Sequence, residues 1–173
     1  MDLARTIEQM ERSARSIEAL CRSQTFPADW KPTPERWSLL EIVAHLADEE
    51  REDFRPRLDR TLHEPERDWD PIDPAGWVTS RDYASRDLET ELNAYLEERA
   101  RSVEWLRSLD APDWSAARTH PVAGTLHAGD LLAAWVNHDL LHLRQITRLQ
   151  FERVEAEAGR YHSEYAGEWP DAR

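Results

Sequence analysis

Two histidines four residues apart are the residues of this sequence whose type and spacing best fit chemistry. His138 and His142 lie in the stretch WVNHDLLHLRQI, which has the apolar spacing of an amphipathic helix. On an α-helix such residues share one face, about 40° around and roughly 6 Å along the axis. Both imidazoles can therefore reach one cation, at about 2.0–2.1 Å for zinc. Burial in a core is equally consistent with this spacing, so the pair alone leaves both roles open.

A third histidine, His45, lies far upstream beside the apolar stripe of another predicted helix, flanked by Val43 and Leu46. If this helix packs against the helix of His138 and His142, three neutral nitrogens converge and leave one coordination position open, as in a catalytic metal centre. That position would take a water molecule, whose pKa the metal lowers, or a substrate thiolate. Because imidazole suits several divalent ions, Zn²⁺, Ni²⁺ and Fe²⁺ all remain open.

Three polar residues lie within about one helical turn of these histidines. Asp48 and Glu49 follow His45 by three and four residues. Either could accept a hydrogen bond from a ligand imidazole, act as a fourth ligand or serve as a general base. They also belong to the acidic run DEERED, so a role as ordinary solvated acids is an equal alternative. Gln145, three residues after His142, could orient that imidazole.

The other residues capable of chemistry favour structural roles. Asp139 lies about 100° around the helix from His138, so we expect it to contact a neighbouring helix. The single cysteine, Cys21, lies in an apolar stripe where a packed thiol is favoured over a nucleophile, and one cysteine excludes an internal disulfide and a cysteine-based metal cluster. The remaining histidines are expected at the surface, in loops or at helix ends: His63, His120, His127 and His162.

Composition and charge limit the class of protein. The 173 residues are 40% hydrophobic and 33% charged with only 5 Gly, which favours a single, mostly helical domain over residues 1–173. The net charge is -13, and arginines alternate with acids, so no basic patch is available for nucleic acid. No apolar run could span a bilayer, and a signal peptide is lacking. We therefore expect a cytoplasmic protein with a small-molecule substrate and neither nucleic-acid nor membrane partners; a homodimer is also open.

The first half of the chain predicts two helices that precede a long connection. Apolar residues three and four apart mark a helix over residues 2–23, and three prolines make residues 25–37 an extended connector. Ser38 and Glu41 form a capping box for the second helix, which continues to about residue 62 with a kink at Pro56.

The second half predicts two more helices and a weaker end. The connection 63–79 could cover a site, although a loop pinned to the surface by Trp69 and Trp77 is slightly favoured. Ser80 is expected to cap a third helix to about residue 109, and a fourth starts at 125–127 and runs past Gln150. Residues 151–173 predict a weaker helix or a frayed tail. With no strand signal, the fold is an all-α four-helix bundle with a long crossover connection after the second helix, and cofactor sites are expected between facing helices.

Three stretches of the sequence resemble the DinB-like superfamily. The resemblance is carried by RWS at 36–38, IVAHLAD at 42–48 and HDLLHLRQI at 138–146. That family consists of small metal-binding four-helix bundles, including relatives of thiol-dependent S-transferases. The resemblance implies that His45, His138 and His142 bind a divalent metal, and the family name implies no DNA-binding activity.

Three functions follow as hypotheses. The first is a metal-dependent S-transferase that uses a low-molecular-weight thiol such as bacillithiol or mycothiol, bound to the metal as thiolate. The second is a metal-dependent hydrolase in which metal-bound water attacks and Asp48 or Glu49 relays protons. The third is a non-catalytic stress protein that binds a metal or a small molecule. A pocket beside the metal lined by Arg or Lys would favour the first, and an exposed apolar helix face with a blocked metal position would favour the third.

Overall fold

The computed structural model describes residues 2–64, 66–120, 124–167 and 169–170. Helices dominate these residues, and a two-stranded antiparallel ribbon connects α5 to α6. In chain order the elements are α1 (Leu3–Arg22), α2 (Leu39–Glu49), α3 (Arg55–His63), α4 (Pro74–Ser80), α5 (Leu88–Ser108), β1 (Ala117–His120), β2 (Gly124–His127) and α6 (Ala128–Ala158).

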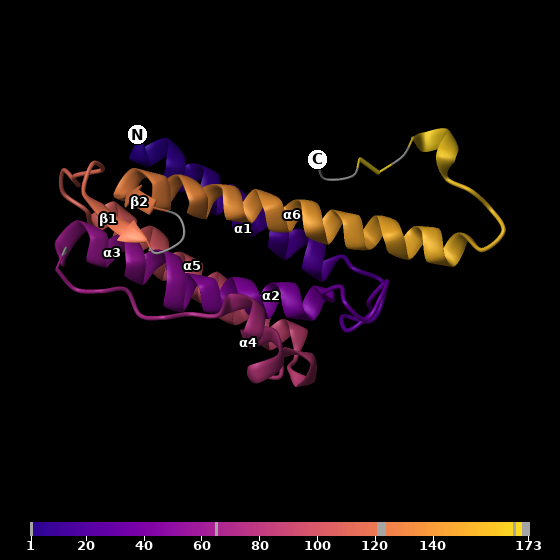
Figure 1. The fold of residues 1–173 in the computed structure, drawn as a ribbon. Helices are drawn as coiled ribbons and strands as arrows, with labels where there is room; N and C mark the ends of the chain where they lie inside the picture. Colours follow the sequence, from indigo (N-terminus) through magenta and orange to yellow (C-terminus); the bar gives the residue numbers. More distant parts are fainter. Residues whose placement is uncertain (1, 65, 121–123, 168, 171–173) are drawn as a thin grey trace.

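Four long helical segments form the predicted bundle. Helix α1 packs between α5 and α6, while the continuous segment α2–α3 packs against the same two helices from the opposite side (Figure 1). The predicted long crossover runs from α3 to α5 and contains α4, which packs on the outer side of α2. Helices that are consecutive in the chain, α1 and α2, therefore lie diagonally across the bundle, and this arrangement brings α2 face to face with α6.

Local sequence signals set the starts of these helices. The Asp2 side chain accepts a hydrogen bond from the backbone of Arg5 at the start of α1. The predicted capping box at Ser38 and Glu41 is present at the start of α2. The fourth helix also begins where expected, because the Asp130 carboxylate accepts hydrogen bonds from the backbone and the ring of His127.

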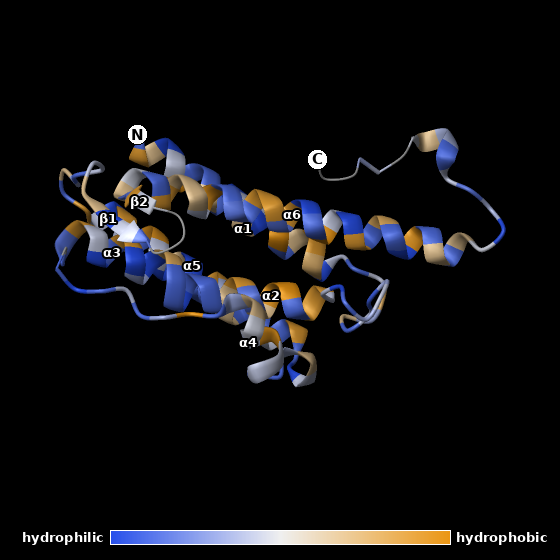
Figure 2. Ribbon diagram, in the orientation of Figure 1, coloured by the Kyte–Doolittle hydropathy of each residue, from blue (hydrophilic) through white to orange (hydrophobic). Residues whose placement is uncertain are grey.

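Helix α2 is buried along its entire length, Leu39–Glu49, and Figure 2 shows it as a largely hydrophobic segment. Because α2 lies under the crossover as well as against α5 and α6, its polar residues cannot face solvent. His45, Asp48 and Glu49 are at most 5% exposed. A buried polar group needs a partner, so each of these side chains has a structural or chemical role inside the protein.

The predicted kink at Pro56 takes the form of a π-helical segment, Glu50–Phe54, that joins α2 to α3. A proline has no N–H and its ring clashes with the carbonyl four residues earlier, so a wider turn just before it relieves the clash. The segment turns Phe54 toward α6, where its ring stacks on Trp135 with centroids 5.7 Å apart.

Three predictions about the second half need correction. Ser80 ends α4 instead of capping the third helix, and the cap of α5 is Asp87, whose carboxylate accepts from the Thr90 backbone. The predicted loop 63–79 contains a helix, α4, because Asp73 caps it and its first residue is a proline. The ribbon β1–β2 was not predicted at all, and its pairing sets Ala117 opposite His127. Beyond α6, only a short 3₁₀ turn, Glu164–Ala166, follows among the described residues.

The tryptophans of the crossover pin it to the bundle. Trp77 is 7% exposed and packs with Ala44 and the fully buried Tyr83. The guanidinium of Arg81 lies 4.0 Å from the Trp77 ring centroid. Trp69 is half-buried between the guanidiniums of Arg57 and Arg118. The crossover is thus a packed layer over α2.

A polar layer divides the apolar core into two clusters. One cluster surrounds Ile17, Ile42 and Ile146, and the other surrounds Met10, Leu58 and Trp135. Between them, the Arg99 side chain crosses the bundle from α5, only 3% exposed. No helix of the described chain is both long and apolar enough to cross a membrane.

Candidate metal centre

Three histidines from two facing helices converge inside the bundle. His45 comes from the middle of α2, and His138 and His142 come from successive turns of α6. The Nε2 atom of His138 lies 3.3 Å from Nε2 of His45 and 3.0 Å from Nε2 of His142. One ligand atom from each residue lies within 4.8 Å of the other two. The structure therefore brings together the three residues that the sequence singled out.

This arrangement fits a divalent metal. Nitrogens bound tetrahedrally at about 2.0–2.1 Å are separated by about 3.3 Å, which is close to the observed Nε2 separations of 3.0 and 3.3 Å. Of the described His, Cys, Asp and Glu residues, only these three form such a cluster. With three ligands from the protein, a tetrahedral ion would keep its fourth position open.

The histidines are neutral at physiological pH, which metal binding by imidazole requires. Burial is the main cause, and it lowers the pKa of His45 to about 3, of His138 to about 2 and of His142 to about 4. The proximity of the other imidazoles lowers the pKa of His45 and His138 further. Protons therefore do not compete with a cation for these nitrogens near pH 7.

Gln145 fixes the tautomer of His142. The side-chain oxygen Oε1 of Gln145 lies 2.8 Å from Nδ1 of His142. An amide oxygen can only accept, so Nδ1 carries the proton and Nε2 presents its lone pair to the other two histidines. A bond of this kind to the distal nitrogen orients a ligand ring and raises its basicity. Gln145 thus lies where the sequence placed it, next to the imidazole it could orient.

Glu49 lies beside the distal nitrogen of His45. Its Oε1 atom is 3.9 Å from Nδ1 of His45, and both atoms are buried without a hydrogen-bond partner among the described residues. Burial, with Asp53 nearby, raises the pKa of Glu49 to about 9. The carboxyl is therefore on the side of the ring away from the converging Nε2 atoms, a position that suits orienting His45 better than contacting a reacting group.

Aromatic rings wall the cluster. The Trp37 ring lies 4.9 Å from the His45 ring and is nearly parallel to the His142 ring at 6.5 Å, measured between centroids. Phe54, turned inward by the π-helical segment, lies 5.0 Å from the His138 ring. These rings limit contact of the imidazoles with water, so the three converging nitrogens lie in largely apolar surroundings.

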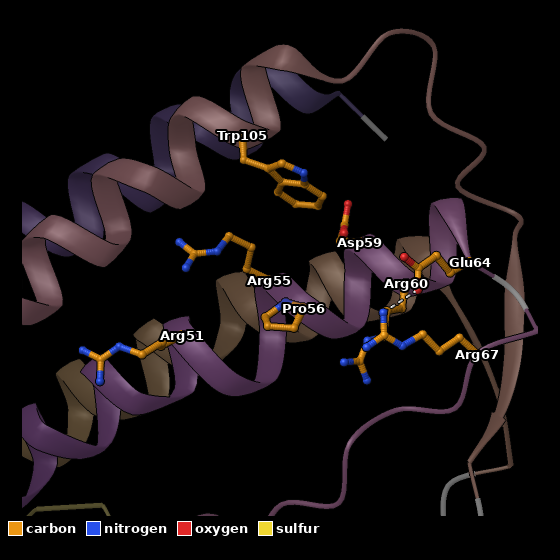
Figure 3. Close-up of a pocket in the computed structure, with 8 residues that line it drawn as sticks. All are labelled: Arg51, Arg55, Pro56, Asp59, Arg60, Glu64, Arg67 and Trp105. Atoms are coloured by element: carbon orange, nitrogen blue, oxygen red, sulfur yellow. Dashed lines mark hydrogen bonds and ion pairs between the residues drawn. The ribbon is translucent and has the colours of Figure 1, made fainter.

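A separate cavity of about 370 Å³ opens between α3 and α5, beneath the ring of Trp105 (Figure 3). Several arginines line it, but they have carboxylate partners: Arg55 pairs with Glu98, Arg60 with Asp70 and Arg67 with Glu64. None of the three histidines lines this cavity. It is therefore not part of the candidate centre.

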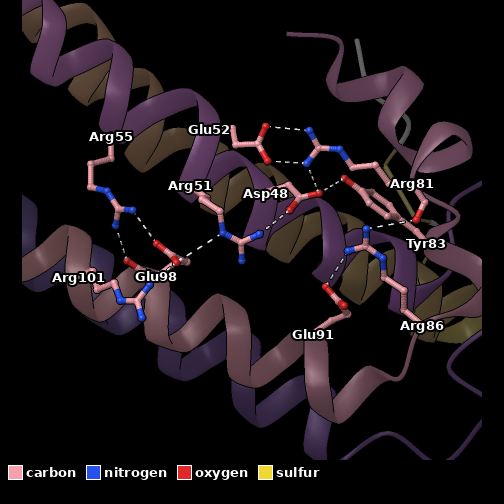
Figure 4. Close-up of polar contacts among 10 residues, drawn as sticks. All are labelled: Asp48, Arg51, Glu52, Arg55, Arg81, Tyr83, Arg86, Glu91, Glu98 and Arg101. Carbon is pink, nitrogen blue, oxygen red and sulfur yellow. Dashed lines mark hydrogen bonds and ion pairs between the residues drawn. The ribbon is translucent and has the colours of Figure 1, made fainter. Parts of the chain in front are cut away.

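Asp48 belongs to an ion-pair network that holds the crossover (Figure 4). Its carboxylate accepts from Arg81 at 2.8 Å, from the Tyr83 hydroxyl at 2.7 Å and from Arg51 at 3.2 Å. Arg81 also forms a two-bond pair with Glu52. All the hydrogen bonds that the described residues give Asp48 are therefore structural, and they attach the end of α4 to α2.

The polar layer around Arg99 positions the two helices that carry the histidines. The sequence analysis did not predict this layer. The guanidinium donates to both carboxylate oxygens of Asp139 at 2.6 and 2.7 Å and to Glu50 at 2.6 and 3.0 Å. Glu50 also accepts from Trp135 Nε1 at 2.6 Å and from the Ser102 hydroxyl at 2.7 Å. Glu50 follows α2 and Asp139 is next to a candidate ligand, so one arginine of α5 connects the two helices that carry the three histidines. The predicted contact of Asp139 with a neighbouring helix is confirmed.

The remaining candidate residues lie outside the centre. Cys21 is buried, and burial raises its pKa to about 12, so it is a packed thiol as expected. His63 ends α3 and His127 precedes α6, where each is paired with a nearby aspartate. His120 ends β1, half-buried, with its ring 5.9 Å from that of Trp69, and His162 is exposed.

Together, the fold and the site define a class: a four-helix bundle protein in which three histidines, two buried and one half-buried, could hold a divalent metal. The sequence comparison narrows the class, because the DinB superfamily model matches residues 4–146. The chain therefore belongs to the DinB superfamily. A search of curated proteins gave no match.

A solved structure supports the fold. YfiT from Bacillus subtilis, described as a probable metal-dependent hydrolase with an unusual four-helix bundle topology, superposes with a TM-score of 0.77. The alignment covers 88% of this chain and 87% of that chain, at 21% identity. The two proteins share the bundle fold across nearly their whole lengths.

Proposed function

We propose that the protein is a divalent-metal-dependent enzyme that uses a low-molecular-weight thiol as its nucleophile, an S-transferase, with His45, His138 and His142 as the metal ligands. The observation that carries the proposal is the convergence of three neutral imidazole nitrogens at 3.0 and 3.3 Å within aromatic walls. Zn²⁺, Ni²⁺ or Fe²⁺ would suit three imidazoles. When bound, the metal would supply Lewis acidity that lowers the pKa of a thiol or water in the open position.

The protein's own residues would prepare the site. Gln145 holds His142 in the tautomer that presents Nε2. Glu49 lies where it could take the same part for His45, since a proton on Nδ1 of that ring has no other acceptor among the described residues. The rings of Trp37 and Phe54 would keep bulk water from the reacting atoms, which strengthens electrostatic interactions at the site.

Two features favour a thiol from outside the protein. Cys21, the single cysteine, is buried with a pKa of about 12 and cannot be the nucleophile. Among the described residues, the cluster of potential ligands contains no carboxylate, and Glu49 lies beside Nδ1 of His45 and not beside the converging Nε2 atoms, which leaves an attacking water without a base in the cluster. A thiol needs less help, because it loses its proton more readily than water does. The single cysteine and the acidic surface also suit a cytoplasmic protein that acts on small molecules rather than nucleic acid.

Elemental analysis tests the centre, and thiol consumption tests the reaction. We expect about one divalent metal per chain in the wild type and its loss in His142→Ala, with His162→Ala as a control because His162 is an exposed histidine. Metal-loaded protein should consume bacillithiol, mycothiol or glutathione in the presence of an electrophile panel, and His142→Ala should not. Absence of metal from both proteins would remove the centre, and absence of thiol consumption across the panel would contradict the transferase.

The alternative is a metal-dependent hydrolase, and the structural similarity to YfiT favours it, since that protein is described as a probable metal-dependent hydrolase. In this case water would occupy the open position, as in metal enzymes with three histidine ligands. The discriminating measurement is ester and amide hydrolysis in the absence of any thiol. Hydrolysis that depends on metal and not on thiol would select the hydrolase, and bound metal without either activity would leave a non-catalytic metal-binding protein.

A further inference from the structure

Another cavity, also of about 370 Å³, lies between the connector that precedes α2 and the crossover that covers α2. One side is formed by Lys31 and Trp37 of the connector and by Glu41 in the first turn of α2. The other side includes Ala75 and Thr79, which are one turn apart on α4. Every residue that lines this cavity belongs to the described part of the chain. Cavities of roughly 300–1,000 Å³ hold small organic ligands, so this one is large enough for a substrate.

Trp37 belongs both to this cavity and to the wall of the histidine cluster. It lines the cavity, and its ring centroid lies 4.9 Å from that of His45 and 6.5 Å from that of His142. A molecule in the cavity would therefore contact the same indole that contacts two of the candidate ligands. The histidines themselves do not line the cavity, so the indole would have to move before such a molecule could reach their nitrogens.

The Trp37 side chain is held by packing alone. It is half-buried, and it forms no hydrogen bond with any described residue. The buried ring of Trp135, by contrast, is fixed by a hydrogen bond from its Nε1 to Glu50 at 2.6 Å. A change of rotamer at Trp37 would thus cost packing contacts with its neighbours but no hydrogen bond. This indole is therefore suited to opening as a minor conformer.

The frame around the indole is fixed by polar contacts. On the connector side, Lys31 donates to Oε1 of Glu41 at 2.6 Å, and Oε2 of Glu41 accepts from the Ser38 backbone at 2.8 Å. On the crossover side, Arg81 follows α4 and donates to the buried carboxylate of Asp48 at 2.8 Å. Both walls of the cavity are therefore anchored to α2, and a rotation of the indole need not displace either of them.

The charges around the cavity do not favour an anion. Its two basic residues, Lys31 and Arg36, already have carboxylate partners, at 2.6 and 3.5 Å. Two further acids line the cavity, Glu35 and Asp82, and neither forms an ion pair with a described residue. An anionic molecule would meet these carboxylates without a free cation to offset them. An uncharged or cationic molecule would not meet this repulsion.

We infer that this cavity binds the substrate of the proposed enzyme, a flat molecule that is uncharged or cationic, and that the Trp37 ring is the gate through which it reaches the histidine cluster. An indole packs well against flat aromatic groups and attracts cations to its face. The role of substrate rests on the proposed function. Binding in the cavity and access to the imidazoles do not require the metal.

Acylation of the histidines in metal-free, full-length protein tests the route. Diethyl pyrocarbonate is a small uncharged reagent that acylates neutral imidazoles, and mass spectrometry gives the rate at each histidine. Because a minor open conformer is typically populated at about 0.1–10%, Trp37→Ala should raise the rates at His45 and His142 by about tenfold or more. The double variant Ala75→Phe, Thr79→Phe places two rings in the cavity and should lower both rates severalfold.

The controls separate a gate from a general loosening of the fold. The exposed His162 should react at the same rate in every variant, and Trp105→Ala, which removes a half-buried indole from the cavity between α3 and α5, should leave His45 and His142 unchanged. Unchanged rates in Trp37→Ala, or an equal rise in Trp105→Ala, would overturn the inference. Since loosening could also raise the rates in Trp37→Ala, the filled cavity decides: acylation as fast as in the wild type would overturn the route.

Three probes of nearly the same shape test the class of molecule. Benzamide is uncharged, benzamidinium is a cation and benzoate is an anion. We expect the first two to protect His45 and His142 of metal-free wild type from acylation, and benzoate to protect them at least about tenfold more weakly. Protection by benzoate at equal concentration would overturn the assigned class. These measurements are independent of the metal, so they can fail while elemental analysis finds the metal, or succeed in a chain that binds none.

Discussion

Replacing Arg99 with methionine should destabilise the protein far more than replacing any surface arginine. Methionine keeps much of the length and the apolar stem of arginine, so the change removes mainly the charge and its hydrogen bonds. Arg99 donates to two carboxylates, Glu50 and Asp139, and to the backbone carbonyl of Met10 at 3.2 Å. Both carboxylates are at most 2% exposed, so in the variant they would remain buried without a counter-charge.

The magnitude follows from this burial. Removing one partner of a buried ion pair costs about 3–5 kcal/mol, because the remaining charge is left uncompensated. A protein of this size is stable by about 5–15 kcal/mol and changes its melting temperature by about 2–4 °C for each kcal/mol. We therefore expect Arg99→Met to lower the free energy of unfolding by about 3–5 kcal/mol, which corresponds to a fall in melting temperature of about 6–20 °C. Since the layer ties the two ligand-bearing helices together, metal affinity should fall as well.

The assay is urea unfolding of metal-free protein, followed by circular dichroism, with Arg101→Met as the control. Arg101 is on the same helix but is 63% exposed at its side chain, where an ion pair contributes about 1 kcal/mol or less. The triple variant Glu50→Gln, Arg99→Met, Asp139→Asn should recover part of the loss, because it removes the unpaired charges. A loss below about 1 kcal/mol in Arg99→Met, or no recovery in the triple variant, would refute the argument.

Three further predictions concern the metal, pH and the crossover. Divalent metal at about 100 times its Kd should stabilise the protein by about 2.7 kcal/mol, and a chelator that leaves the melting temperature unchanged would show that the histidines are only packed. In metal-free protein the depressed pKa of each of the three histidines means that stability is lost as pH falls below 6.5, by about 1.4 kcal/mol per histidine between pH 7.5 and 5.5. The raised pKa of Glu49 acts in the opposite direction, because its contribution to stability is lost as pH rises toward 9. When the pH falls from 7.5 to 5.5, the free energy of unfolding measured with urea should therefore fall by only about 1.4 kcal/mol in the wild type and by about 4 kcal/mol in Glu49→Gln. Equal pH profiles in the two proteins would contradict this assignment. Asp48→Asn should lower the free energy of unfolding by about 1–3 kcal/mol in the same assay and leave the metal content unchanged, because its hydrogen bonds hold the crossover. Loss of metal from this variant would instead indicate that Asp48 takes part in the metal centre.

The convergence of the three histidines was predictable because the apolar stripes of two helices fix which faces meet. His45 lies within the buried segment of α2, and His142 follows the apolar spacing of α6, so packing those faces together brings the rings together. The cap at Ser38 and the start of the fourth helix near His127 were equally local and therefore predictable. The ribbon β1–β2 was not, because four-residue strands with no apolar alternation carry no periodic signal.

The polar layer could not be read because its partners are distant in sequence. Arg99 is 49 residues from Glu50 and 40 from Asp139, and each belongs to a stretch that resembles a solvated helix face.

One signal was available for the π-helical segment. Residues facing the bundle recur every four positions in this part of the chain. On a regular α-helix each step of four residues rotates the side chain by about 40° around the axis, and a π-helical turn, which holds more residues, compensates for this rotation. The series is Ile42, Leu46, Glu50, Phe54, Leu58 and Leu62.

The charges of the polar layer also bear on the histidines beside it. Two carboxylates, those of Glu50 and Asp139, face a single guanidinium, that of Arg99. Asp139 is adjacent in sequence to His138, and Glu50 lies just over one helical turn beyond His45. The three histidines themselves are neutral, and besides burial and the neighbouring imidazoles, the positive charge of Arg99 is one of the causes that lower the pKa of His138. The layer that holds the helices in place therefore also helps to keep the His138 nitrogen free of a proton, and so available to a metal ion.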